Sequence, residues 1–186
     1  MELNRQGNSY FDKPDESSPD VFVHYADLDH DGADEKIVVD LKYKNTGTIS
    51  VFKGEKYIWS DHTSIRGKDE GEDGEEGWTG HHLYEEDGKS YLLTWSHYMY
   101  NGEGQYGLYV FNFDRNGDQV DYLTENVMFN IYSGEYEPNT VSEARELAHK
   151  ANQYLEKSIV LISCDNGKFI YSTEGNPITE TFDIEW

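Results

Sequence analysis

Acidic side chains recur at alternate positions of the segment 27–35, a spacing that can surround a metal ion. The oxygen ligands at odd positions of this loop would come from Asp27, Asp29, Asp31, Ala33 (through its backbone carbonyl) and Glu35. Carboxylates this close repel one another unless a cation lies between them. Calcium accepts about six to eight oxygen ligands and tolerates irregular geometry, and Gly32 permits the sharp turn that such a loop needs. We therefore predict a structural calcium ion as the cofactor of this chain.

The segments on either side of this loop distinguish it from an EF-hand. An EF-hand requires a bidentate glutamate at the twelfth loop position, and here that position is Val38. The flanking segments 21–25 and 36–41 are rich in β-branched and aromatic residues, which favour strands over helices. The loop is therefore expected to join two strands of a hairpin. The alternative is an ordinary solvated acidic turn, since Asp-Gly is by itself a common hairpin signal.

The same segment resembles the FG-GAP/VCBS-type repeat of extracellular proteins. The shared pattern is a strand, then Asp-x-Asp-x-Asp-Gly-x-x-Asp/Glu, then a strand of Ile and Val, and the matching residues are Asp27, Asp29, Asp31, Gly32 and Glu35, followed by 37–39. The resemblance implies loops that bind calcium and blades of a β-propeller. This chain has one good copy of the repeat, and Glu35 stands where Asp is commoner.

A weaker copy of the loop lies at 112–120. Asn112, Asp114 and Asn116 occupy its first, third and fifth positions, and Gly117 the sixth. Arg115 adds a positive charge and Val120 takes the closing position, so these three residues form a candidate second metal loop of weak affinity. An Asn-Gly hairpin turn is the favoured interpretation.

The remaining pattern predicts a mainly β fold of antiparallel meanders with one α-helix. Short apolar segments separated by turn residues indicate a four-stranded unit over 21–59 and a second meander over 81–123, which suggests a loose duplication with propeller-blade-like units. A capping box at 140–143 and an apolar stripe at helical spacing predict a helix over about 141–157. A hairpin over 158–173 should follow, and the tail 178–186 could add a last strand.

Composition and charge limit the domain organisation and the partners. We expect a polar N-terminal tether over 1–20, one β-rich domain over 21–186, and a mobile acidic loop at 67–77. The formal net charge is −22, from 37 acidic and 15 basic residues, which disfavours nucleic acid and anionic membranes as partners. No apolar stretch is long enough for direct membrane insertion. Cys164 lies in an apolar run and is expected to be a small buried residue.

Two further groups of residues have types that could form a site. His81 and His82 are adjacent on a predicted strand, so their side chains point to opposite faces and cannot share one metal ion, and both should be surface or half-buried residues. Tyrosines around a glycine-rich loop form a candidate ligand surface, because exposed aromatic rings on a sheet can stack against sugars or another protein. Its members are Tyr98, Tyr100 and Tyr106.

These observations favour a non-catalytic binding module outside the cytoplasm, stabilised by structural calcium, with a protein or a glycan as its ligand. We expect it to be secreted or held at the cell surface as a lipoprotein, with the native signal missing from this sequence, because weak calcium sites would stay empty in cytosol. One alternative is an acidic intracellular inhibitor or immunity-type protein that binds a basic partner. Another is a glycoside hydrolase, although sequence spacing cannot identify its pair of carboxylates.

Overall fold

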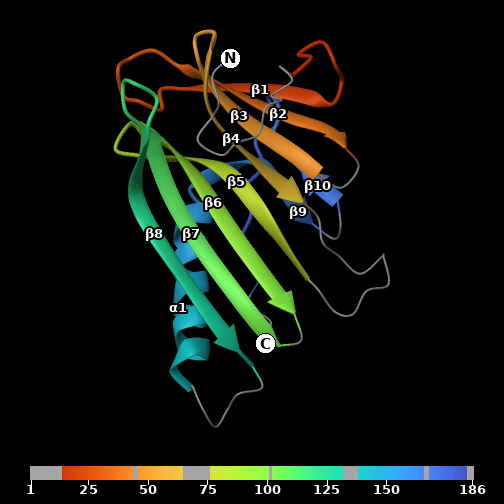
Figure 1. Cartoon of the computed structure of the whole chain (residues 1–186), viewed down its shortest axis with the longest axis vertical. Helices are drawn as coiled ribbons and strands as arrows, with labels where there is room; N and C mark the ends of the chain where they lie inside the picture. The colour runs from red at the N-terminus through yellow and green to blue at the C-terminus, as the bar shows by residue number, and fades with distance from the viewer. Residues whose placement is uncertain are drawn as a thin grey trace, which may run out of the picture.

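The computed structural model describes residues 14–43, 46–64, 76–100, 102–131, 138–165 and 168–183. These residues form two antiparallel sheets and one helix (Figure 1). The prediction of a mainly β fold with antiparallel meanders and one helix in the C-terminal half is therefore confirmed. No helix among the described residues is long and apolar enough to span a bilayer.

The first sheet is a four-stranded meander in the order β1-β2-β3-β4. Its strands are β1 (Val21–Ala26), β2 (Glu35–Tyr43), β3 (Thr46–Lys53) and β4 (Lys56–Ser64). The predicted unit over 21–59 has these four strands, because strands that follow one another in the chain pair as antiparallel neighbours.

The second sheet has six strands in the order β10-β9-β5-β6-β7-β8. Its meander comprises β5 (Glu76–Glu86), β6 (Lys89–Tyr100), β7 (Glu103–Phe113) and β8 (Gln119–Asn130). The hairpin of β9 (Ser158–Asp165) and β10 (Lys168–Ile170) adds to the free edge of β5. The second meander therefore differs from a four-stranded propeller blade, since it is extended by a hairpin from far along the chain.

Helix α1 (Pro138–Leu155) packs on the face of the second sheet opposite the first sheet (Figure 1). Its predicted apolar stripe is confirmed, because all five side chains are buried: Ala144, Leu147, Ala148, Ala151 and Leu155. The helix begins at Pro138, earlier than predicted, since proline is compatible with the first helical turn. Thr140 is therefore inside the first turn rather than at the cap.

The core lies in two layers, one on each face of the second sheet. Between α1 and this sheet lie Leu93, Trp95, Leu108 and Val110, among others. Between the two sheets lies a separate cluster that includes Leu28, Ile37, Val39, Val51, Phe111, Phe113 and Leu161. Because successive side chains of a strand point to opposite faces, β6 and β7 contribute to both layers.

Several sequence predictions need correction. The described tail residues 178–183 form no strand; they lie against β9 and α1, where the N–H of Val160 donates to Ile178 (2.8 Å) and Asn152 bonds Phe182. Two residues of the predicted tether 1–20 contact the first sheet: Glu16 pairs with Lys36 (2.6 Å), and the Asp20 carbonyl accepts from Leu41 N–H, while residues 1–13 lie outside the described residues. The predicted acidic loop 67–77 ends in β5, and residues 65–75 lie outside the described residues.

Candidate functional site

The acidic loop 27–34 between β1 and β2 is fixed to both sheets. Leu28 is fully buried between the sheets, and its carbonyl accepts a hydrogen bond from Phe113 N–H at the end of β7 (3.0 Å). The His30 ring bonds the carbonyl of Ser90 in β6 (3.0 Å). His30 and Gly32 take positive φ values of 57° and 93°, which turn the chain back toward β2. The loop therefore belongs to the first sheet and is held against the second sheet by these contacts.

Three of the five predicted calcium ligands come together. The carboxylates of Asp27, Asp29 and Glu35 each place an oxygen within 4.8 Å of the others, and Asp29 and Glu35 are buried. Asp31 stays outside this group. The N–H of Ala33 donates a hydrogen bond to Asp31 (3.0 Å). The role of the Ala33 carbonyl as a calcium ligand stays a prediction. Within the described ranges this is the one such group of acidic, histidine or cysteine side chains.

Backbone N–H groups of the loop already supply some of the hydrogen bonds that these carboxylates can accept. Asp27 accepts hydrogen bonds from Asp31 and Gly32 (both 3.0 Å), and Glu35 accepts from Leu28 (2.8 Å) and Asp29 (3.2 Å). These bonds hold the side chains inside the loop in a fixed orientation. They account for the tight turn whether or not a cation is bound.

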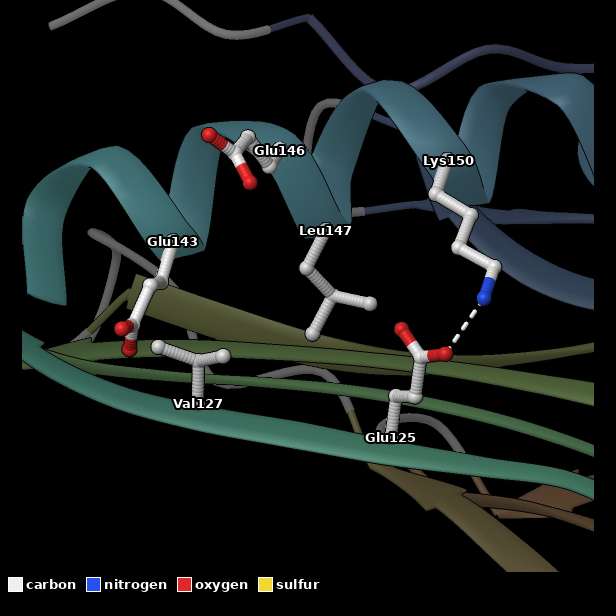
Figure 2. A pocket seen from close by; sticks show the side chains of 6 residues that line it. All are labelled: Glu125, Val127, Glu143, Glu146, Leu147 and Lys150. Carbon is white, nitrogen blue, oxygen red and sulfur yellow. Dashed lines mark hydrogen bonds and ion pairs between the residues drawn. The ribbon is translucent and has the colours of Figure 1, made fainter.

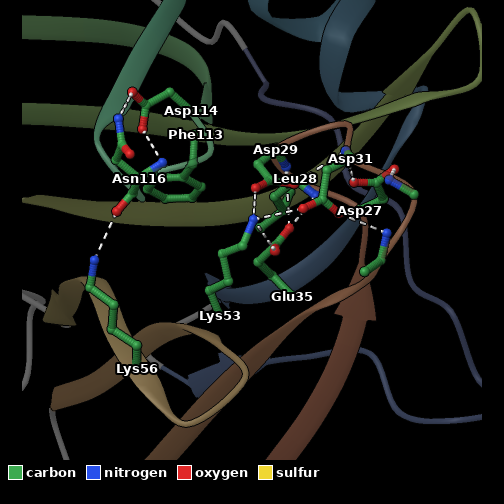
Figure 3. Close-up of polar contacts among 12 residues, drawn as sticks. Asp27, Leu28, Asp29, Asp31, Glu35, Lys53, Lys56, Phe113, Asp114 and Asn116 are labelled. Carbon is green, nitrogen blue, oxygen red and sulfur yellow. Dashed lines mark hydrogen bonds and ion pairs between the residues drawn. The ribbon is translucent and has the colours of Figure 1, made fainter.

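The feature that sequence reasoning missed is Lys53 at the end of β3. Its ammonium forms ion pairs with Asp29 and with Asp31 (2.9 Å) and lies 3.9 Å from Glu35 (Figure 3). A positive charge therefore already lies among the acidic groups. Nothing in the pattern of residues 27–35 indicated this, because Lys53 arrives through the pairing of β2 with β3.

The ionisation of the loop reflects this arrangement. The hydrogen bonds to Asp29 and Asp31 raise the pKa of Lys53, so its ammonium is charged at neutral pH. The same contact, helped by Ala33 N–H, lowers the pKa of Asp31. Burial raises the pKa of Glu35, although the N–H of Leu28 opposes this effect. An additional cation beside Glu35 would favour its charged form and lower this pKa.

The three carboxylates suit a hard cation, provided that the Lys53 ammonium moves away. Carboxylate oxygens are the ligands that calcium prefers, and three of them converge here. An ion that took all three would have to displace the Lys53 ammonium, because Lys53 contacts Asp29 and approaches Glu35 from β3. Lys53 is about one-third exposed, so it can swing into solvent.

The second loop has the contacts of a hairpin turn. Asp114 accepts hydrogen bonds from the N–H groups of Asn116 (2.8 Å) and Asp118 (2.9 Å), and the backbone bonds lower its pKa. The amide of Asn112 contacts the neighbouring carbonyl of Phe113 (3.4 Å). The carbonyl of Asn116 accepts from Lys56 (2.8 Å), which fixes this turn to the β3–β4 hairpin (Figure 3). These contacts explain the Asn-Gly sequence without a metal.

A first hollow lies between α1 and β8. Val127 and Leu147 form its apolar floor, and Lys150 pairs with Glu125 across it (Figure 2). Glu143 and Glu146 add further carboxylates to the rim.

A second hollow, of about 320 Å³, lies between β4 at the edge of the first sheet and the β5–β8 meander of the second sheet. Aromatic rings of Trp59, Tyr109 and Phe111 line it. Its polar groups come from Asp61, Thr79, Thr94, Ser96 and Gln119. This hollow combines rings, hydroxyls and one carboxylate, which sequence spacing could not reveal because five strands, β4 to β8, contribute to it.

The adjacent histidines lie on opposite faces of β5, as predicted, but both are buried rather than at the surface. His81 bonds the hydroxyl of Thr94 (3.1 Å), a residue of the second hollow. His82 bonds Glu180 (2.6 Å), which also accepts from Ser163 (2.9 Å). Ser163 donates to the glutamate and not to His82, so this cluster fixes the tail and lacks the order of a nucleophilic triad.

The three tyrosines that were predicted to form one ligand surface do not lie on the same face of the sheet. Tyr106 is 1% exposed and packs against Trp95 and Phe129, so its prediction as a surface residue is wrong. Tyr98 is half-buried and Tyr100 is 37% exposed. Alternation along β6 places these two on the same face as Thr94 and Ser96, beside the second hollow.

Comparisons with protein-family models, curated proteins and solved structures found no match.

Proposed function

We propose that this protein is a non-catalytic binding module that works outside the cytoplasm, secreted or anchored at the cell surface, and that a calcium ion in the loop 27–34 clamps its two sheets together. The observation that carries the proposal is the convergence of the carboxylates of Asp27, Asp29 and Glu35. The FG-GAP/VCBS-like pattern of the loop supports the same reading.

The clamp acts through the loop anchors. Leu28 lies between the sheets and bonds β7, while His30 bonds β6. An ion that fixes Asp27, Asp29 and Glu35 would therefore fix the position of the first sheet on the second. In the absence of calcium, Lys53 supplies the compensating charge at the same place. Calcium and Lys53 are thus alternative partners for one group of carboxylates.

A thermal unfolding experiment in EDTA and in calcium tests the clamp. Weak extracellular sites have dissociation constants of about 10⁻⁴–10⁻³ M. Calcium at about ten to a hundred times the dissociation constant would therefore stabilise the folded state by about 1.4–2.7 kcal/mol. Asp27→Asn should reduce this shift, whereas Asp34→Asn, an exposed position outside the carboxylate group, should leave it unchanged. Equal melting curves in EDTA and calcium would refute the clamp.

A basic partner protein inside the cell is the second candidate. The net charge of −22 favours it, because complementary fields speed association and select partners. Affinity capture at low and high salt distinguishes the two. A basic protein that is retained at low salt and lost at high salt, together with absence of a calcium shift, would support the inhibitor and oppose the clamp.

A further inference from the structure

The hollow beside β4 has a buried histidine behind its wall, next to the carboxylate of Asp61. His81 is 2% exposed, and its Nδ1 atom bonds Thr94. The backbone of His62 and the carboxylate of Asp61 both act on the ring, and Asp61 Oδ2 lies 4.0 Å from Nε2. His81 does not itself line the hollow, so a ligand there would meet Asp61 as its charged hydrogen-bond acceptor.

Asp61 is available for that role. Its Oδ1 atom accepts the N–H of His62 (2.8 Å), and its side chain is 43% exposed at the edge of the hollow. A ligand hydroxyl can donate a hydrogen bond to this carboxylate. Hydrogen bonds to an ionised carboxylate are stronger than those between neutral groups.

The rings beside these polar groups supply a flat apolar surface. Tyr109 lies close to Gly107, where an added Cβ would be 2.7 Å from the ring, so the glycine lets the ring lie across the sheet. Trp59 stands on the other side, with its ring 5.3 Å from that of Phe111. Aromatic rings that line the same hollow as hydroxyls and a carboxylate suit a ligand that is apolar on one side and hydroxylated around its rim.

The charge of the site limits the class of ligand. Among the described residues that line the site, Asp61 is the one that carries a charge, and the chain has a net charge of −22, so an anionic ligand would be repelled. A volume of about 320 Å³ is at the lower end of the range for small-molecule sites, about 300–1,000 Å³, and suits one ring rather than a folded partner. A single carboxylate also lacks the pair that glycoside hydrolysis requires.

We infer that this hollow is the ligand site of the binding module and that it holds a neutral pyranose unit of a glycan. The ring of the sugar stacks on Trp59 or Tyr109, and its hydroxyls bond Asp61, Thr94 and other polar side chains that line the hollow. The inference rests on the proposed function as a binding module and names the class of its ligand. It places the binding surface beside Tyr98 and Tyr100, with β4 as the second wall.

The experiment titrates the full chain with methyl glycosides of glucose, galactose and mannose, using calorimetry and saturation-transfer NMR. Glucitol serves as the acyclic control and glucuronic acid as the charged control. At least one pyranoside should bind in the millimolar range, while both controls bind more weakly. Asp61→Asn and Trp59→Ala should each weaken binding about tenfold or more, and Tyr25→Ala, an exposed tyrosine on β1, should change nothing.

Absence of binding by all three pyranosides would overturn the inference, and so would binding that survives both substitutions. Asp61 is half exposed, so Asp61→Asn remains a fair test if Trp59→Ala unfolds the protein. Calcium-dependent melting of the same samples separates the two proposals. A normal calcium shift without pyranoside binding refutes the sugar site alone, and pyranoside binding without a calcium shift refutes the clamp alone.

Discussion

Lys53 and Asp29 form an ion pair between the end of β3 and the acidic loop, with the Asp29 side chain only 1% exposed. The pair places a cation of the chain where the loop pattern predicts a metal ion. Taking a buried carboxylate out of water is costly unless it is paired, so the folded chain needs a positive charge at this point. Lys53 and a bound cation can each supply it, which makes their competition measurable.

Lys53→Met should separate the two roles. In EDTA the variant should melt at a lower temperature than the wild type, because Asp29 and Glu35 are left buried without a compensating charge. In calcium it should show a larger stabilisation and a tighter calcium affinity than the wild type, since the ion no longer displaces an ammonium. Calorimetric titration and thermal melts check this. Lys56→Met, whose ammonium bonds the Asn116 carbonyl, is the matched control and should not change calcium affinity.

Leu28→Ala should destabilise the acidic loop without changing any charged side chain. Leu28 is completely buried between the sheets, and truncation of such a side chain costs about 2–5 kcal/mol. Because the loop would lose its anchor, calcium affinity should also fall, which distinguishes an anchored loop from an independent turn. Chemical denaturation measures the first effect and calorimetry the second. Unchanged calcium binding in a destabilised variant would show that the loop holds its shape without the core.

Stability should decrease as the pH falls from about 6.5 toward 4. Burial lowers the pKa of His81 to about 4 from its ordinary value near 6.5. A base with a lowered folded-state pKa contributes stability above the unfolded pKa and loses it as pH falls through that range, because the unfolded state takes up the proton first. Burial also lowers the pKa of His24, which acts in the same direction.

Denaturation midpoints measured across this pH range check the effect of His81. The loss attributable to it is on the order of 3 kcal/mol at most. His81→Asn should flatten the pH dependence, whereas His62→Asn, whose side chain is 68% exposed, should leave it nearly unchanged. An identical slope in wild type and His81→Asn would contradict the assignment.

Gly107→Ala should disturb the ring of Tyr109 and little else. The added Cβ would lie 2.7 Å from that ring, which must move away. The pyranoside affinity should therefore fall while the calcium-dependent melting shift remains. Gly88→Ala is a turn control, where the added Cβ meets no atom within 4 Å but φ is +72°, so its effect should be on stability alone. Equal pyranoside affinity in wild type and Gly107→Ala would show that Tyr109 does not carry the sugar.

Asn152→Ala should loosen the C-terminal tail. Asn152 in α1 accepts from Phe182 N–H (2.6 Å) and donates to its carbonyl (2.8 Å), which holds the Phe182 ring against Trp95 and Tyr106. Two hydrogen bonds of this kind contribute about 1–3 kcal/mol. Gln153→Ala, an exposed neighbour on the same helix, is the control. Hydrogen exchange of the Phe182 amide and denaturation midpoints check the prediction.

Local pattern in the sequence determined the strands, the turns and the helix. Alternation and turn residues placed the two meanders, and the stripe from Ala144 to Leu155 placed the buried face of α1. These features depend on residues close in sequence, where backbone preference and burial act together. The pattern also identified Asp27, Asp29 and Glu35 as neighbours, because the loop that joins them is short.

Tertiary structure alone decided which residues from distant parts of the chain contact these elements. The β9–β10 hairpin joins the edge of β5, although about seventy residues separate the two strands that pair. Lys53 reaches the acidic loop through the pairing of β2 with β3, and Asp61, Thr94 and Tyr109 line one hollow from three strands. Tyr106 and Tyr98 face opposite sides of the second sheet because the pleat and register set their directions. Contacts between distant strands depend on how whole surfaces pack, and no short window of sequence contains that information.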